Sequence, residues 1–184
     1  MKMLKKLLAV VLTGAMALTL LTACGGNAVG NAVTEKNIAD VLTDMAKGDG
    51  RIFTFTSRAE EREMARNIAA LLEGKVTDDD SKDAIEKILD YDQGGANADN
   101  FVWYGKVIAD EIGINGQAIQ IVYDVLDSEN AENHQNLYDK NMGPADDRYI
   151  GTALCKMRNK DGEDSKLVTW RVIVVTAKAE GYNG

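Results

Sequence analysis

Two apolar segments close to the C-terminal end of the sequence constrain the fold most strongly. Residues 148–157 and 167–177 are rich in β-branched and aromatic side chains, and the polar stretch 158–163, which contains Gly162, joins them. This pattern is typical of two antiparallel strands in a hairpin. In the second segment apolar side chains occupy both alternating faces, with Val168, Trp170, Val172 and Val174 on one and Ile173 and Val175 on the other. Apolar residues on both faces predict a strand inside the sheet rather than at its edge.

Helical patterns precede the hairpin. Apolar residues recur at spacings of three and four, which predicts helices over 34–48, 57–74, 78–89, 99–112 and 116–127, with a short strand at 52–56. The second helix begins with Ser57-Arg58-Ala59-Glu60, which matches a capping box. In the fourth helix, Phe101, Gly105, Ile108 and Ile112 would share one side. Helices followed by an antiparallel hairpin predict an α+β fold, with about five helices packed on a small antiparallel sheet.

The first 24 residues carry the pattern of a secretion signal. Residues 1–6 hold three lysines and no acid, and residues 7–21 are almost all apolar or small, a run that is short for a membrane span. Leu21-Thr22-Ala23-Cys24 resembles the lipobox of bacterial lipoproteins, and the alternative is an ordinary secretory signal that happens to precede a cysteine. The resemblance implies that Cys24 is lipidated and becomes the N-terminus. We therefore expect a signal peptide over 1–23, a lipidated flexible tether over 24–33, and one extracytoplasmic domain over 34–184, anchored to the cell membrane.

Composition limits the classes of function. The formal net charge is −8, and loss of residues 1–23 with their three lysines leaves −11, which argues against nucleic-acid binding. Two cysteines cannot form a disulfide framework, and one histidine permits at most one histidine-dependent role. No G-x-S-x-G, H-E-x-x-H or phosphate-binding G-x-x-x-x-G-K sequence occurs. No cofactor is predicted. Once Cys24 is lipidated, Cys155 is left alone, and we interpret it as a small buried residue of a strand.

A few residues are candidates for a site. His134 lies in a polar stretch near Glu132, where it could serve as a general base or a metal ligand, although a solvated surface histidine is the interpretation that we favour. Trp103 and Tyr104 are consecutive aromatic residues, so one of them could reach a groove, and packing in the core is the favoured alternative. A metal site is left undecided.

The last 80 residues suggest a second family. The segments in question are Gly105–Ala109, Ala118–Ser128, His134–Leu137, Arg148–Ala153 and Trp170–Val174. Their order resembles the C-terminal half of the CAP superfamily, the cysteine-rich secretory, antigen 5 and pathogenesis-related proteins. Lys106 stands where that family has a glutamate, and Val125 where it has a tryptophan. The family's site pairs two histidines with two glutamates, so a chain with one histidine cannot form it, and the resemblance implies binding more than catalysis.

Three hypotheses for the function follow. In the first, which we favour, a membrane-anchored lipoprotein binds a peptide, a glycan or a small ligand in a groove lined by His134, Asn136, Glu132 and one of Trp103 and Tyr104. In the second, His134 and either Glu111 or Glu132 form the site of a metal-assisted hydrolase. In the third, the protein is an interaction or scaffold subunit of the cell envelope. The sequence favours a binding protein and leaves enzymatic activity open.

Overall fold

The computed structural model describes residues 27–76, 79–110, 112–127, 134–158 and 166–181. The chain divides into two compact units, 1–33 and 34–184, and the fold described below is that of the second. The expected signal peptide and Cys24 lie outside the described residues, as do Glu111 and Glu132. In the described part of the chain, no helix combines the length and the apolar character needed to cross a bilayer.

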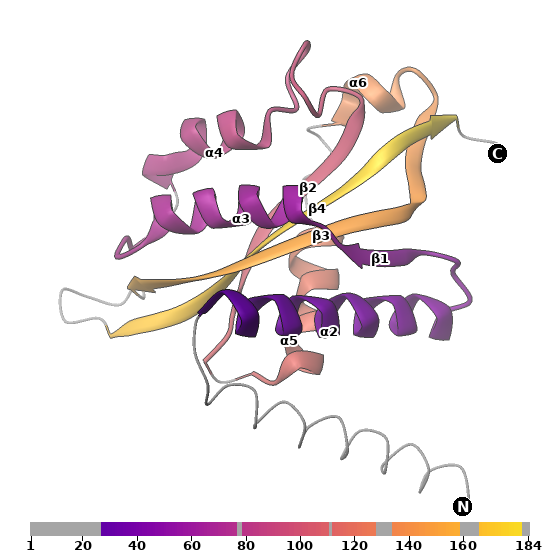
Figure 1. Ribbon diagram of the computed structural model, residues 1–184. Coiled ribbons are helices and arrows are strands. Elements are labelled where there is room, and N and C mark those ends of the chain that lie inside the picture. The colour runs from indigo at the N-terminus through magenta and orange to yellow at the C-terminus, as the bar shows by residue number, and fades with distance from the viewer. Residues whose placement is uncertain (1–26, 77–78, 111, 128–133, 159–165, 182–184) are drawn as a thin grey trace, which may run out of the picture. The chain divides into compact units, whose positions relative to one another are not determined.

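Helices and strands are interleaved along the chain (Figure 1). The α-helices are α2 (Asn27–Gly48), α3 (Ala59–Leu72), α4 (Lys82–Leu89), α5 (Ile114–Ile121) and α6 (Gln135–Tyr138). A 3-10 turn, η1 (Asp79–Ser81), precedes α4, and a π-helical turn, η2 (Val122–Leu126), continues α5. The strands are β1 (Thr54–Ser57), β2 (Asn100–Ile108), β3 (Met142–Arg158) and β4 (Leu167–Gly181).

The four strands form one mixed sheet in the order β1-β3-β4-β2. β3 and β4 pair antiparallel from Met157 opposite Val168 back to Arg148 opposite Ala177, which is the predicted C-terminal hairpin. β2 pairs antiparallel with β4, whereas β1 runs parallel to β3. The predicted α+β class is confirmed, and the parallel β1 makes the sheet mixed instead of wholly antiparallel.

The predicted helix over 99–112 is wrong, because residues 100–108 form strand β2. Phe101, Trp103 and Val107 point to one face of the sheet and Val102 to the other, and all four are buried. A strand covered on both faces carries apolar residues without alternation, so period alone cannot distinguish it from a buried helix. The clustered aromatic and β-branched residues of this segment were the better signal.

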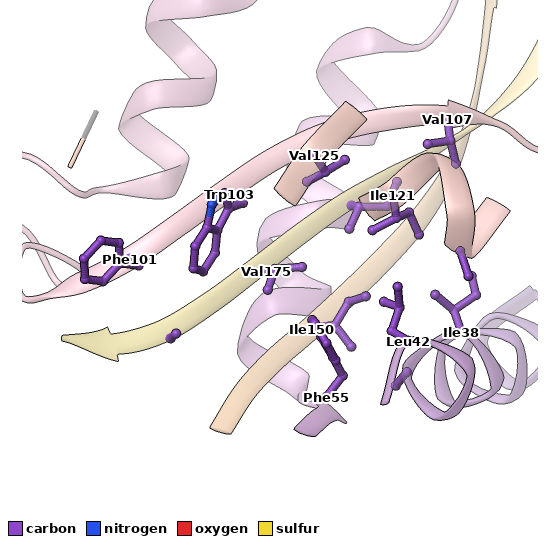
Figure 2. Packing of buried hydrophobic residues seen from close by; sticks show 14 of the residues in the cluster. Ile38, Leu42, Phe55, Phe101, Trp103, Val107, Ile121, Val125, Ile150 and Val175 are labelled. Carbon is purple, nitrogen blue, oxygen red and sulfur yellow. The ribbon is translucent and has the colours of Figure 1, made fainter. Parts of the chain in front are cut away.

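Helices cover both faces of the sheet (Figure 1). On one face, Ile38 and Leu42 of α2 and Ile121 of α5 pack against buried strand residues such as Ile150 and Val175, as Figure 2 shows. On the other face, α3 and α4 contribute a second cluster that is packed against the sheet. Its buried members are Ala65, Ile68, Ala69, Leu72, Ile85, Leu89, Val102, Ala153, Cys155, Met157, Val172 and Val174. The result is a sheet with a helical layer on each side.

Helix α3 lies directly on β3 at a glycine. A Cβ atom added to Gly151 would stand 2.0 Å from the backbone nitrogen of Arg62 and from the backbone carbon of Glu61. Only a residue without a side chain allows the two backbones to approach this closely. Gly151 therefore sets how close the first turn of α3 lies to the sheet, and this contact places Glu61 and Arg62 against the strands.

Beyond the end of β1, other groups take up the free edge of β3. The Thr152 amide donates to Oε2 of Glu35 at 2.7 Å, and the Lys156 amide donates to Oε2 of Glu73 at 2.9 Å. The chain that leaves α3 adds backbone bonds from Gly74 to the carbonyl of Lys156 and from Arg158 to the carbonyl of Lys75. Unpaired strand edges can pair with strands of other molecules and cause aggregation, and these contacts leave fewer edge groups of β3 free to do so.

Candidate functional site: a cavity around Arg148

A cavity of about 260 Å³ lies on the face of the sheet that α2 and α5 cover. We call it the Arg148 cavity. Its apolar wall comes from six parts of the fold and consists of Leu42, Met45, Ala46, Phe53, Phe55, Trp103, Val122, Leu126, Tyr138 and Pro144. Its charged lining residues are Asp49, Arg51, Asp127 and Arg148. The cavity therefore combines aromatic and aliphatic walls with a small number of charged groups, as ligand pockets do.

The local sequence explains how the wall forms. Phe53 and Phe55 are two residues apart at β1, so their side chains point to the same face of the strand. Trp103 on β2 also points to this face, and Figure 2 shows it on the same side of the sheet as Phe55. Arg148 pairs with Phe55 on one side and Ala177 on the other, immediately after a shift in the β3 register between Pro144 and Arg148. Irregularities of this kind re-aim side chains, which brings the arginine into the cavity.

Arg148 is held by aromatic rings. Its Cζ atom lies 3.8 Å from the ring centroid of Phe53, 5.4 Å from that of Trp103 and 5.7 Å from that of Phe55. These are cation–π distances, so the rings stabilise the positive charge and fix the plane of the guanidinium group. Only 8% of the residue is exposed.

This buried arginine is not fully paired. Its Nε atom is buried and has no hydrogen-bond partner among the described residues. No ion pair found in that part of the chain includes Arg148. Burial lowers the pKa of Arg148, and the nearby Asp146 carboxylate opposes that change. An arginine stays protonated at neutral pH despite such a shift, so the cavity contains a buried cation with an unused donor.

A second cavity, of about 620 Å³, lies on the opposite face among α3, α4 and the strand ends. We call it the Glu61 cavity. Glu61 at its floor is fully buried and accepts hydrogen bonds from both Nε and Nη2 of Arg58 and, at 2.5 Å, from the Thr176 hydroxyl. The Arg58 guanidinium lies 3.9 Å from the ring centroid of Tyr149. Burial alone would raise the pKa of Glu61, but the bonds from Arg58 and Thr176 outweigh it and the pKa is lowered. The charged floor of this cavity is therefore already satisfied.

A third group of buried charges joins the elements of the fold. Glu35 of α2 is fully buried and accepts bonds from the Ser57 hydroxyl, from Nη2 of Arg62 at 2.6 Å and from the Thr152 amide. Ser57 is thus committed to Glu35, and the predicted capping box is wrong. Helix α3 begins after Arg58, whose side chain makes no cap bond.

Arg171 of β4 is a further member of this group of buried charges. Its Nε donates to Oε1 of Gln117 at 2.7 Å and its Nη1 to the Thr152 hydroxyl at 3.1 Å. Burial lowers the pKa of Arg171 to about 10, while the Glu35 carboxylate opposes the shift. Arg171 is as deeply buried as Arg148, but its donors have partners within the fold.

The structure places His134 in the core, so the expectation of a solvated surface histidine is wrong. Its exposed fraction is 2%, and its ring centroid lies 5.0 Å from that of Phe101 and 6.0 Å from that of Trp103. Nε2 lies 2.7 Å from the carbonyl oxygen and 3.2 Å from the amide nitrogen of Val102. The shorter contact favours a neutral imidazole that donates to the carbonyl. His134 lines neither of the two cavities.

The other predicted site residues are scattered. Trp103 lines the Arg148 cavity, whereas Tyr104 packs half-buried against the cluster on the opposite face. Asn136 is exposed on α6, and Glu111 and Glu132 lie outside the described residues. Of the predicted groove, the described part of the chain brings only Trp103 to one of these cavities. In that same part, no three His, Cys, Asp or Glu side chains are grouped to hold a metal ion.

Cys155 occupies the position that the sequence predicts. It is buried in β3, 2% exposed, and its thiol is free. Burial, with a smaller contribution from Glu73, raises the pKa of the Cys155 thiol to about 11. A thiol that stays protonated at neutral pH is a weak nucleophile, so this cysteine is a packing residue.

Sequence reasoning missed Arg148, Phe53 and Phe55. Arg148, Ile150 and Thr152 alternate along a predicted strand, which places an arginine on the same face as an inward-pointing isoleucine. A charged residue on a buried face is rare and calls for an explanation. That signal could have identified Arg148.

Comparisons with protein-family models, with curated proteins and with solved structures found no match to this chain. The resemblance to the CAP superfamily stays a prediction.

Proposed function

We propose that this protein is a membrane-anchored, extracytoplasmic binding protein that holds a small ligand in the Arg148 cavity. The anchor is lipid on Cys24, proposed from Leu21-Thr22-Ala23-Cys24 and from the charged and apolar segments that precede it. Once residues 1–23 are removed, the lipid would hold an acidic chain at the outer face of a membrane. The peptide and glycan alternatives belong to a larger and more open site than a cavity of about 260 Å³.

The observation that carries the binding role is that Arg148, a lining residue of an aromatic cavity, has a buried Nε without a partner among the described residues. Leaving a buried polar atom unsatisfied has a cost in folding free energy. Among the described residues Gln120 Oε1 and Trp170 Nε1 share this state, but Arg148 is the one charged group of the three. The wall includes η2, and single π-helical turns of this kind occur frequently at functional sites. Trp103, Phe53 and Phe55 supply apolar surface against which a ring or a short chain can be buried.

Tryptophan fluorescence tests ligand binding. The chain has two tryptophans, and Trp170 packs on the α3 face, away from the cavity. In a Trp170→Phe variant the emission therefore comes from Trp103 alone. We expect small aromatic or aliphatic compounds to change this emission saturably, and a Leu126→Phe substitution, which narrows the cavity without adding a tryptophan, to reduce or abolish the change. A panel of acidic, neutral and basic compounds that leaves the emission unchanged at millimolar concentration would contradict the binding role.

The anchor is tested separately in a bacterial host. We expect the full chain to fractionate with the membrane and to incorporate a labelled fatty acid. Cys24→Ser should abolish the labelling, and Cys155→Ser should leave it unchanged because that thiol is buried in β3. Equal labelling of the full chain and the Cys24→Ser variant would remove the lipoprotein assignment.

A further inference from the structure

We infer that the ligand of the Arg148 cavity is a monoanionic carboxylate on an aromatic or aliphatic body, and that its carboxylate pairs with Arg148. This inference rests on the proposed binding function and adds the chemical class of the ligand. It rests on the Arg148 side chain, because its positive charge, its burial and its unpartnered Nε all indicate that it binds an anion.

The guanidinium group has a buried donor that the described residues do not use. The Phe53 ring lies against one face of the group at 3.8 Å, and faces of a guanidinium carry no N–H bonds. The donors lie in the plane, and one of them, Nε, has no partner among the described residues. A carboxylate binds to the edge of a guanidinium group through two parallel N–H···O bonds, which is the strongest and most directional pairing open to an arginine.

The arginine is also preorganised. Contacts with Phe53, Trp103 and Phe55 hold the guanidinium in place before any ligand arrives. A long side chain that is already ordered loses little conformational freedom on binding, so more of the interaction free energy becomes affinity. The same rings form the wall beside the charge, so a ligand that reaches Arg148 with its carboxylate places its body against them.

The other charged groups at the cavity limit the charge of the ligand. Arg51 is exposed, and its Cζ atom lies 5.7 Å from the Phe53 ring centroid. Asp49 and Asp127 also line the cavity, and both are exposed. These two carboxylates would repel a second negative charge on the ligand. A monoanion is therefore favoured over a dianion such as a phosphate monoester. The volume of about 260 Å³ further favours a small acid over a long acyl chain.

The test compares compounds that differ only in charge. The full chain carrying Trp170→Phe is reconstituted in phosphatidylcholine nanodiscs and titrated with 3-phenylpropanoate, 3-phenylpropanamide, 3-phenylpropylamine and phenyl phosphate. We expect the carboxylate to bind about tenfold more tightly than the amide, because the amide is neutral and offers one acceptor oxygen in place of two. The amine and the phosphate should bind more weakly than the carboxylate.

Variants of the arginine identify the group that is responsible. Arg148→Met retains the length and apolar contacts of the side chain, and should reduce the affinity for the carboxylate to that for the amide. Arg148→Lys keeps the charge but loses the planar pair of donors, and should give an intermediate affinity. Arg66→Met is the matched control, because Arg66 is an exposed arginine of α3 on the opposite layer, and it should preserve the preference for the carboxylate.

The outcomes separate the inference from the proposed function. Equal affinities for the carboxylate and the amide in the unmodified site would overturn the inference while leaving the cavity a binding site. Tighter binding of the amine would also overturn it and would assign recognition to Asp49 or Asp127. Tighter binding of phenyl phosphate would replace the monoanion with a dianion. If no compound changes Trp103 emission, the proposed function fails as well.

Discussion

Two buried charges on opposite faces of the sheet, Glu61 and Arg148, differ in how their hydrogen bonds are satisfied. On the α3 side, the buried carboxylate of Glu61 is surrounded by donors from Arg58 and Thr176. On the α2 side, the buried cation of Arg148 has aromatic neighbours and an Nε without a partner. The difference indicates two uses of a buried charge. A satisfied charge acts as a joint between elements, and an unsatisfied one is available for recognition.

Glu35 is the clearest joint. Its carboxylate connects α2 to Ser57 at the end of β1, to Arg62 of α3 and to the amide of Thr152 in β3. A buried carboxylate is tolerated only when its lone pairs are satisfied in this way. Because the Glu35 carboxylate joins four elements, loss of its charge should weaken the packing of all four.

The largest effect that we predict is therefore the loss of the Glu35 charge. Glu35→Gln keeps the shape of the side chain but leaves Arg62 and the neighbouring Arg171 without a buried counter-charge. Removing one partner of a buried ion pair typically costs several kcal/mol, and Arg62 is partly exposed, so we expect the free energy of unfolding to fall by about 3 kcal/mol. Urea denaturation followed by tryptophan fluorescence measures the change.

Glu60→Gln is the matched control for this substitution. Glu60 is an exposed carboxylate on the same helix as Arg62, and its ion pair with Arg58 lies at the surface. Exposed pairs contribute little, so we expect a change below about 0.5 kcal/mol. Similar losses in the two variants would show that Glu35 is not a joint of the fold.

A smaller effect is expected at Arg148, although this residue is 8% exposed. Arg148→Met removes the cation–π contacts, which stabilise the fold, and also the unsatisfied buried donor, which destabilises it. The two effects oppose each other, so the free energy of unfolding should change by less than about 1 kcal/mol in the same urea experiment. A loss as large as that of Glu35→Gln would make Arg148 a structural residue and remove the contrast between satisfied and unsatisfied buried charges.

The smallest effect concerns pH and His134. Burial lowers the pKa of His134 below its ordinary value of 6.5, while the bond to Val102 opposes the shift. The unfolded chain therefore takes up a proton near pH 6.5 that the folded chain resists. Stability is fully present above pH 6.5 and falls as the pH drops through 6.5 towards the folded pKa.

Unfolding measured between pH 7.5 and 5.5 checks this expectation, because that window spans the ordinary histidine pKa of 6.5. His134→Gln retains an amide donor for the Val102 carbonyl and cannot titrate, so its free energy of unfolding should vary less with pH than that of the unsubstituted chain. Parallel pH profiles for the two proteins would exclude His134 as the titrating group.

The sequence predicts the fold where patterns are local. The β3-β4 hairpin, helices α3 and α4 and the buried Cys155 all follow from periodicity and from runs of apolar residues. The sequence-based prediction is wrong at residues 100–108, because apolar side chains on both faces of β2 give a spacing that also fits the apolar side of a helix. The parallel pairing of β1 could not be predicted either, because it joins residues about 93 positions apart.

The candidate site is harder to predict because its parts are distant in the chain. Trp103 was singled out for its residue type, but nothing local to it indicates that Phe53 and Arg148 share its surroundings. His134 drew attention as the single titratable imidazole, and its core position is set by contacts with Phe101 and Val102. Burial of a polar group depends on tertiary packing, and the polar residues next to His134 in the sequence give no sign of it.

Glu35 has a mechanical consequence in the proposed anchored protein. In an anchored domain every pull arrives through the chain that precedes the fold, which here continues into helix α2 from Asn27, and Glu35 is the second residue of the unit 34–184. Its bonds to β1, α3 and β3 connect that point to three elements at once. A pull at this end would therefore be shared among contacts to three elements of the fold instead of being borne by α2 alone.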